Sequence, residues 1–188
     1  VRDAAEAALA GAGLPVDAAA QPDGPTRRRR LLVSDMDSTM ITCECIDELA
    51  DFAGVKAEVS AVTERAMRGE LDFAEALTAR VSTLTGLADG VLARAFGERV
   101  RLMPGARTLV ATMRSQGARA VLVSGGFTYF TARVAALCGF DDHRANVLEI
   151  EDGRLTGRVI PPILGADAKV EALDHYAGLW AGGLGGAL

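Results

Sequence analysis

Two aspartates separated by one residue, Asp35 and Asp37, come directly after a short apolar run, residues 31–33. An apolar run without polar alternation is typical of a strand in a parallel sheet that is covered on both faces. Ligands of open α/β sheets bind at the carboxyl ends of the strands, so both carboxylates can face one cavity. Two like charges in such a cleft require a cation or a shared proton. The pattern predicts acid–base or metal chemistry, with a helix cap at Asp35 and a turn over residues 37–39 as the alternative.

A serine and two glycines, residues 124–126, follow a second apolar run, residues 120–123. A hydroxyl and accessible backbone N–H groups suit a phosphate oxygen, although the same tripeptide could form only a tight turn. Lys56 and Lys169 are the only lysines among the 20 basic residues. A compact ammonium can neutralise a phosphate, although Lys169 taken alone could equally be a solvated helix residue. Together the aspartates, the tripeptide and Lys169 predict a phosphoryl-transfer site.

The elements that must position these residues alternate along the chain. Apolar runs and an Asp-Gly turn signal predict strands over residues 31–33, 120–123, 147–150 and 154–160. Apolar periodicity and capping residues predict helices over residues 2–10, 46–53, 59–67, 73–81, 87–96, 106–114, 129–137 and 168–177. Strands that alternate with helices predict an α/β fold with a parallel sheet. Because residues 45–101 carry no comparable strand signal, we expect an all-helical insert there.

Composition excludes several classes of protein. The 188 residues are 49% hydrophobic and 24% charged, which predicts one folded domain with a small insert rather than a disordered or fibrous chain. Charged residues interrupt every apolar run before the ~18 residues that a membrane span needs. A net charge of −5 argues against nucleic-acid or anionic-membrane partners. Three cysteines, an odd number, predict a reducing compartment, the cytoplasm. Cys43 and Cys45 make a poor zinc site, because there is no second cysteine pair and the only histidines are His143 and His175.

The three motifs together resemble those of the haloacid-dehalogenase-like (HAD) phosphatases. The first motif is Asp-Met-Asp-Ser-Thr at residues 35–39, the second is Ser-Gly-Gly at residues 124–126, and the third is Lys169. Within this superfamily the chain is most similar to the phosphoserine phosphatases, through the segments 43–50, 67–73, 80–81 and 123–127. The resemblance extends over about residues 31–177.

This resemblance implies a domain organisation. It implies a Rossmann-like HAD core with a parallel sheet, formed by residues 31–44 and 102–188, and a small all-helical cap domain formed by residues 45–101. Residues 1–30 are expected to be an N-terminal helix and linker.

The resemblance also implies roles for the motif residues. Asp35 would attack phosphorus and become an aspartyl-phosphate, and Asp37 would act as the general acid and then the general base. Ser124, the Gly125 N–H group and Lys169 would hold phosphate oxygens. Mg²⁺ would bind the Asp35 carboxylate and the Asp37 backbone carbonyl and polarise the phosphoryl group.

Substrate recognition is implied for four residues of the insert and the segment before it. Glu44 would bind an ammonium group, Arg80 a carboxylate, and Met67 with Phe73 would form a wall of the pocket. The resemblance implies O-phospho-L-serine as the substrate, and the chemistry fits, because a zwitterionic amino acid needs one anion and one cation to be oriented. From the residues alone, Glu44 could be a first-turn helix acid, Arg80 a surface residue, and Met67 and Phe73 apolar core.

One motif of the family has no counterpart in this sequence. The fourth motif, a Gly-Asp-Gly-x-Asn-Asp-like loop that completes the magnesium site, should follow the helix that carries Lys169. A segment omitted between Tyr176 and Ala181 would explain this, and otherwise we expect weak Mg²⁺ binding and impaired catalysis.

Four functions stay open on the sequence. Hydrolysis of phosphoserine is the first, and hydrolysis of another small phosphomonoester is the second. A phospho-accepting signalling module is a third, which Asp37 and the helical insert argue against because such a module needs neither a second acid–base group nor a substrate lid. A form that binds without catalysis is the fourth.

Overall fold

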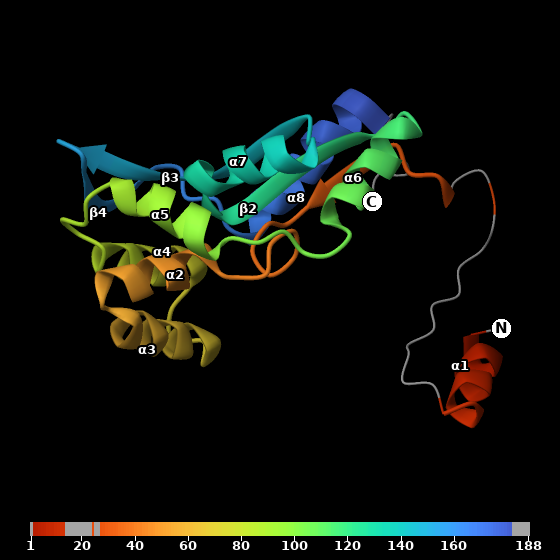
Figure 1. Cartoon of the computed structure of the whole chain (residues 1–188), viewed down its shortest axis with the longest axis horizontal. Coiled ribbons are helices and arrows are strands. Elements are labelled where there is room, and N and C mark those ends of the chain that lie inside the picture. Colours follow the sequence, from red (N-terminus) through yellow and green to blue (C-terminus); the bar gives the residue numbers. More distant parts are fainter. Residues whose placement is uncertain (1, 14–23, 25–26, 182–188) are drawn as a thin grey trace.

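The computed structural model describes residues 2–13, 24 and 27–181 (Figure 1). Parts of the predicted N-terminal linker, residues 14–23 and 25–26, and the end of the predicted core, residues 182–188, lie outside the described residues. The strands are β1 (Leu31–Ser34), β2 (Arg119–Phe127), β3 (Asp142–Glu151) and β4 (Arg154–Ile160). The helices are α1 (Arg2–Gly11), α2 (Cys45–Ala53), α3 (Lys56–Met67), α4 (Phe73–Ser82), α5 (Gly90–Arg99), α6 (Ala106–Ser115), α7 (Thr128–Cys138) and α8 (Ala166–Tyr176), and a π-helical turn, Ala177–Ala181, follows α8.

The four strands form one sheet in the order β1-β2-β3-β4. β1 is parallel to β2 and β2 is parallel to β3, whereas β4 returns antiparallel to β3. The return takes place at Asp152 and Gly153, whose φ angles of 48° and 72° are both left-handed, as a type I′ hairpin turn requires. The predicted α/β fold with a mainly parallel sheet is therefore confirmed, and so is the predicted hairpin.

Alternate residues of β1 and β2 face two different layers of helices. Leu32, Ala120 and Leu122 belong to a large buried cluster that includes residues of α6 and α7. Leu31, Val121 and Val123 belong to a smaller cluster with Ala172 and Tyr176 of α8. Side chains that alternate along a strand point to opposite faces of the sheet, so the sheet lies between α6–α7 and α8. This coverage explains why residues 31–33 of β1 and 120–123 of β2 are all apolar.

Four helices, α2 to α5, lie between β1 and α6 in the chain and beside the sheet in Figure 1. The buried faces of α2, α4 and α5 belong to the same cluster as the α6–α7 side of the sheet, through Leu49, Leu77, Val81 and Leu92. Helix α4 begins with a capping box, in which the Asp72 carboxylate accepts from Glu75 N–H and the Glu75 carboxylate accepts from Asp72 N–H. The division into a core and a cap domain at residues 45 and 101 stays a prediction.

Strand β2 is longer than its apolar run predicts. It continues from residue 123 through the Ser-Gly-Gly tripeptide to Phe127. The register of its pairing with β3 shifts between Val123, opposite Arg144, and Phe127, opposite Asn146. Four steps along β2 thus correspond to two steps along β3, so the tripeptide forms a bulge and does not follow the regular ladder.

Among the described residues, no helix is long and apolar enough to span a membrane.

Candidate active site

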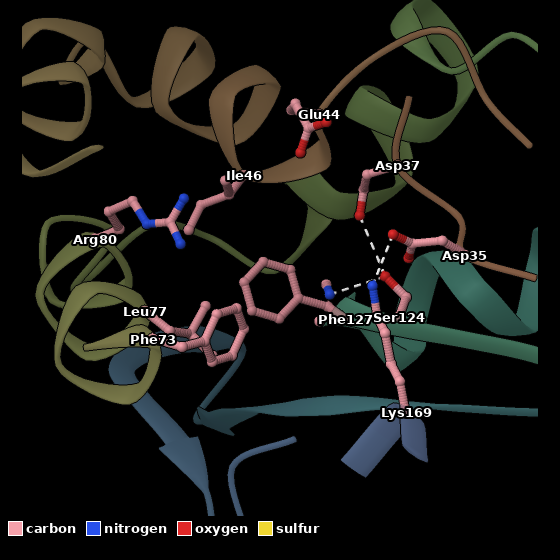
Figure 2. A pocket seen from close by; sticks show the side chains of 12 residues that line it. Asp35, Asp37, Glu44, Ile46, Phe73, Leu77, Arg80, Ser124, Phe127 and Lys169 are labelled. Atoms are coloured by element: carbon pink, nitrogen blue, oxygen red, sulfur yellow. Dashed lines mark hydrogen bonds and ion pairs between the residues drawn. The ribbon is translucent and has the colours of Figure 1, made fainter. Parts of the chain in front are cut away.

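The carboxyl ends of β1 and β2 bring the predicted motifs together. Ser34, the last residue of β1, pairs with Leu122 of β2, so Asp35, directly after β1, and Ser124, two residues further along β2, lie near the same end of these parallel strands. Helix α8 packs across the sheet from α6 and α7, and its first turns bring Lys169 to this end. Figure 2 shows these side chains converging on one pocket.

Asp37 is held from two directions. Its Oδ1 atom accepts from Cys45 N–H at the start of α2 at 2.9 Å, and its Oδ2 atom accepts from the Ser124 hydroxyl at 3.3 Å. A Cβ atom on Gly126 would lie 2.6 Å from Asp37 Oδ2, so only glycine leaves room for this carboxylate. Burial raises the pKa of Asp37, and this outweighs the lowering effect of the Cys45 N–H bond. A carboxyl group with a raised pKa is suited to carry a proton during a reaction.

Asp35 and Lys169 form an ion pair. Lys169 Nζ donates to Asp35 Oδ2 at 2.7 Å, and the N–H group of Met36 donates to Asp35 Oδ1 at 2.9 Å. Asp35 and Lys169 are both only partly buried, so a ligand in the pocket can reach them.

The bulge of β2 supplies the remaining polar groups on this side. The Ser124 oxygen accepts from Gly126 N–H at 2.9 Å while its hydroxyl donates to Asp37, so the rotamer of this buried serine is set by two neighbours. Because the bulge interrupts the ladder, backbone N–H groups in it can face a ligand rather than a strand.

Helix α4 forms the opposite side of the pocket. Phe73, Leu77 and Arg80 line it, and their spacing of four and three residues places them on one face of the helix. Figure 2 shows the three side chains across the pocket from Asp35, Asp37 and Lys169.

Two further charged residues line the pocket, Arg80 on α4 and Glu44 at the start of α2. Glu44 is the N-cap residue of α2, and its Oε1 atom accepts from the Ser38 hydroxyl at 2.6 Å. Arg80 Nε donates to the carbonyl of Ala76 at 3.2 Å, which leaves the rest of its guanidinium for other partners. Burial lowers the pKa of Arg80, and Asp47 and Glu44 oppose this shift, so Arg80 stays a cation at neutral pH.

The pocket encloses about 180 Å³. Pockets for drug-sized ligands are larger, at ~300–1,000 Å³. The pocket therefore suits a small molecule that carries an anionic group and, in addition, a charged group of each sign.

Eight of the nine predicted site residues line this pocket, and Met67 does not. The eight are Asp35, Asp37, Glu44, Phe73, Arg80, Ser124, Gly125 and Lys169. Met67 is the last residue of α3 and its side chain is 84% exposed. The remaining lining residues, which the sequence reasoning missed, are Ile46, Leu77, Gly126 and Phe127. Helical periodicity from Arg80 could have identified Leu77, since residues three apart share a helix face.

The oxygen ligands for a cation are few. The Asp35 carboxylate and the backbone carbonyl of Asp37 are hard oxygen donors of the kind that Mg²⁺ prefers, and Mg²⁺ sites commonly combine one or two carboxylates with substrate phosphate and water. In the part of the chain that the structure describes, no group of three His, Cys, Asp or Glu residues could hold a metal. The residues present thus fit a metal shared with a bound phosphate better than a closed protein site.

The three cysteines are free thiols, and the N–H group of Cys45 donates a hydrogen bond to the Asp37 carboxylate.

Comparisons with known proteins agree on one family. The model of the haloacid dehalogenase-like hydrolases matches residues 32–186. The chain is 49% identical over 151 residues to a phosphoserine phosphatase of Archaeoglobus fulgidus, which covers 80% of this chain and 44% of that protein. It is 47% identical over 150 residues to a phosphoserine phosphatase of Idiomarina loihiensis, covering 80% of this chain and 68% of that protein.

A solved structure gives the same result for the fold. The unliganded probable phosphoserine phosphatase of Vibrio cholerae superposes with a TM-score of 0.74 at 42% identity, covering 84% of this chain and 48% of that one. The chain thus spans roughly half of the length of several relatives that it matches.

Proposed function

The chain belongs to the haloacid dehalogenase-like hydrolases, and from this premise we propose that it hydrolyses O-phospho-L-serine to L-serine and phosphate. One observation carries the proposal: Asp35, Asp37, Ser124 and Lys169 line the same small pocket as Glu44 and Arg80. The first four are groups that can accept and hold a phosphoryl group, and the last two match the charges of an amino acid.

In the first step, a carboxylate oxygen of Asp35 forms a bond to phosphorus while the bond between phosphorus and the seryl oxygen breaks. Asp37 gives its proton to the departing seryl oxygen, which leaves as the hydroxyl of serine. The raised pKa of Asp37 supports this role, because a carboxyl group with a higher pKa holds a proton more readily. The phosphoryl group is now an acyl phosphate on Asp35.

In the second step, water displaces the phosphoryl group from Asp35. Asp37, now a carboxylate, accepts a proton from the water as its oxygen bonds to phosphorus. The bond between phosphorus and the Asp35 oxygen breaks, and phosphate leaves with Asp35 restored. One carboxyl group thus serves both steps, because the atom that loses a proton in the first step regains it in the second.

Three groups would hold the phosphoryl oxygens. The Ser124 hydroxyl and the Gly125 N–H group lie on the bulge of β2, and the Lys169 ammonium approaches from α8. Lys169 already contacts Asp35 Oδ2, so it lies beside the attacking atom. Fixed donors of this kind stabilise charge that develops on phosphoryl oxygens in the transition state.

Two charged side chains of the pocket, Glu44 and Arg80, would select the amino acid. Glu44 would bind the ammonium group and Arg80 the carboxylate, while Phe73 covers the pocket from α4. Met67 lies away from this pocket and takes no part in the proposal.

We also propose Mg²⁺ as the cofactor, held by oxygens of Asp35 and Asp37 and by the substrate phosphate. Mg²⁺ would neutralise phosphate charge and polarise the phosphoryl group. Three free cysteines among the described residues support a reducing compartment, and we propose the cytoplasm.

Phosphate release from a panel of monoesters tests the proposal. With Mg²⁺ present, phosphoserine should give a higher kcat/KM than phosphoethanolamine, which lacks the carboxylate, and than glycerol phosphate, which lacks both amino-acid charges. A wild-type chain that prefers glycerol phosphate would make it a phosphatase for another small ester. No turnover of any ester, together with a long-lived phosphorylated Asp35, would indicate a phospho-accepting module.

A further inference from the structure

Asn146 is a buried polar side chain next to the proposed phosphate site. It lies on β3 opposite Phe127 of β2 and is 1% exposed. A side-chain amide between Ala145 and Val147, in an interior strand of the sheet, costs free energy unless its polar atoms find partners. Those partners identify what the residue does.

All three of its hydrogen bonds go to the backbone of two segments. Asn146 Nδ2 donates to the carbonyl of Gly125 at 2.8 Å and to the carbonyl of Leu164 at 3.1 Å. Asn146 Oδ1 accepts from the N–H group of Leu164 at 2.7 Å. Both carbonyls face the amide nitrogen and the N–H group faces the amide oxygen, so only one orientation of the amide satisfies the three bonds.

The two segments carry the phosphate ligands. Gly125 lies in the bulge of β2, where the register with β3 shifts and the regular ladder does not hold the backbone. Leu164 lies two residues before Ala166, the first residue of the helix that presents Lys169. One side chain therefore connects the bulge with the start of α8.

We propose that Asn146 is a positioning residue that sets the separation between the Ser124–Gly125 backbone and Lys169, so that both can hold one phosphoryl group. This inference rests on the proposed phosphatase function. Neither segment is positioned by regular secondary structure at the point of contact, because one is a bulge and the other a loop. The three bonds of Asn146 supply the constraint that a strand ladder would otherwise supply.

The hydrogen bonds of Asn146 also position the two glycines, Gly125 and Gly165, against which the Phe73 ring packs. A Cβ atom on Gly125 would lie 2.8 Å from the Phe73 ring, and one on Gly165 would lie 3.0 Å from it, so the ring lies against both glycines. Asn146 is hydrogen-bonded to Gly125 and to Leu164, the residue that precedes Gly165 in the chain. Displacement of either segment would therefore also move the contact between α4 and the sheet edge.

A core hydrogen bond with no role in the site is the alternative, and Thr131 provides the matched control. Thr131 is fully buried on α7, and its hydroxyl contacts the Thr128 carbonyl at 3.4 Å and His143 Nδ1 at 3.0 Å. Thr131 does not line the pocket. Loss of buried hydrogen bonds lowers stability at both positions, but only the loss at Asn146 should change phosphate binding.

The test compares Asn146→Ala and Asn146→Asp with Thr131→Val in the full chain with Mg²⁺. Calorimetry with inorganic phosphate should show about 10-fold weaker binding for both Asn146 variants, the cost of displacing one hydrogen bond to a charged group. The kcat/KM for phosphoserine should fall roughly 10²-fold, as expected for a misplacement of about 1 Å. Thr131→Val should leave both quantities near the wild-type values.

Hydrogen exchange at the Leu164 amide separates the two Asn146 variants. Asn146→Asp keeps the acceptor for this N–H group and should keep its protection, whereas Asn146→Ala should lose it. A folded Asn146→Ala variant that binds phosphate as tightly as wild type would overturn the proposal. If Asn146→Ala does not fold, Asn146→Leu, which has a similar size and adds no charge, decides by the same measurement. Phosphate binding needs no turnover. If the wild-type chain binds phosphate but does not hydrolyse phosphoserine, that result therefore contradicts only the proposed substrate and not the role of Asn146.

Discussion

Lys169 Nζ lies 2.7 Å from Asp35 Oδ2, although 134 residues separate the two in the chain. The second oxygen of Asp35 is held by Met36 N–H, so each carboxylate oxygen has its own donor and the carboxylate plane is fixed. The ion pair is partly solvated, and its contribution to folding is correspondingly small. Its importance lies in the site, where one ammonium adjoins both the oxygen proposed to attack phosphorus and the proposed phosphate position.

Replacing Asp35 by asparagine should abolish turnover. Asparagine keeps the side-chain volume but lacks the anionic oxygen that attacks phosphorus, so kcat should fall on the order of 10⁴- to 10⁶-fold. Phosphate release measured with Asp35→Asn checks this, with the exposed Asp174→Asn on α8 as the control of the same chemical change. Turnover within a few-fold of wild type would refute the assignment of the nucleophile.

Replacing Arg80 by alanine should harm phosphoserine hydrolysis selectively. The variant loses a charge-assisted contact to the substrate carboxylate, which predicts a roughly 10- to 100-fold lower kcat/KM for phosphoserine. An aryl phosphate, which lacks the carboxylate, should be affected far less. Arg80→Lys should recover little, because lysine lacks the bidentate fork.

The exposed Arg94 on α5 is the matched control for Arg80, since Arg94→Ala removes the same charge outside the pocket. Equal losses on the two substrates in Arg80→Ala would assign Arg80 a structural role instead.

Replacing Gly165 by alanine should displace Phe73. The backbone of Gly165 has a negative φ of −110°, so alanine is tolerated by the backbone itself, but its Cβ would lie 3.0 Å from the Phe73 ring. We expect a higher KM for phosphoserine with a thermal midpoint close to wild type. Gly178→Ala, where a new Cβ would meet nothing within 4 Å, is the control. An unchanged KM would show that the ring adapts without consequence for the pocket.

Replacing Tyr176 by phenylalanine should change how stability depends on alkaline pH. The Tyr176 hydroxyl donates to Asp142 and accepts from Arg144 Nε. Burial, followed by the bond to Asp142, raises the pKa of Tyr176 above its ordinary value of 10.0. A raised pKa in the folded state means that the stabilising effect is complete below the unfolded pKa of ~10 and is lost as pH rises through the folded value.

Denaturant titrations at several pH values check this. Wild type should lose stability more steeply than Tyr176→Phe above about pH 10, while at pH 7 the variant should be less stable by about 1–2 kcal/mol. Lysine and arginine titration is common to both proteins and cancels in the difference. Parallel curves over the whole range would show that the hydroxyl contributes nothing through its ionisation.

Much of this protein follows from local patterns in its sequence. The apolar runs before Asp35 and before Ser124 predict strands, because a buried strand needs apolar side chains on both faces. Asp72 and Gly54 mark a helix start and a helix end, because a carboxylate can accept N–H bonds and a glycine can take a left-handed conformation. Ligand binding at the carboxyl ends of parallel strands then places the two motifs together.

Local sequence patterns do not predict contacts between segments that are distant in the chain. Strand β2 extends through its two glycines because β3 pairs with Phe127, and no local propensity predicts that pairing. The exposed position of Met67 and the inclusion of Leu77 in the pocket depend on how α3 and α4 are oriented by packing. The sequence alone therefore determined which residue types could do the chemistry and on which elements they lie. The tertiary structure alone decided which of them meet and what holds them, as with Asn146, because those contacts depend on the packing of segments far apart in the chain.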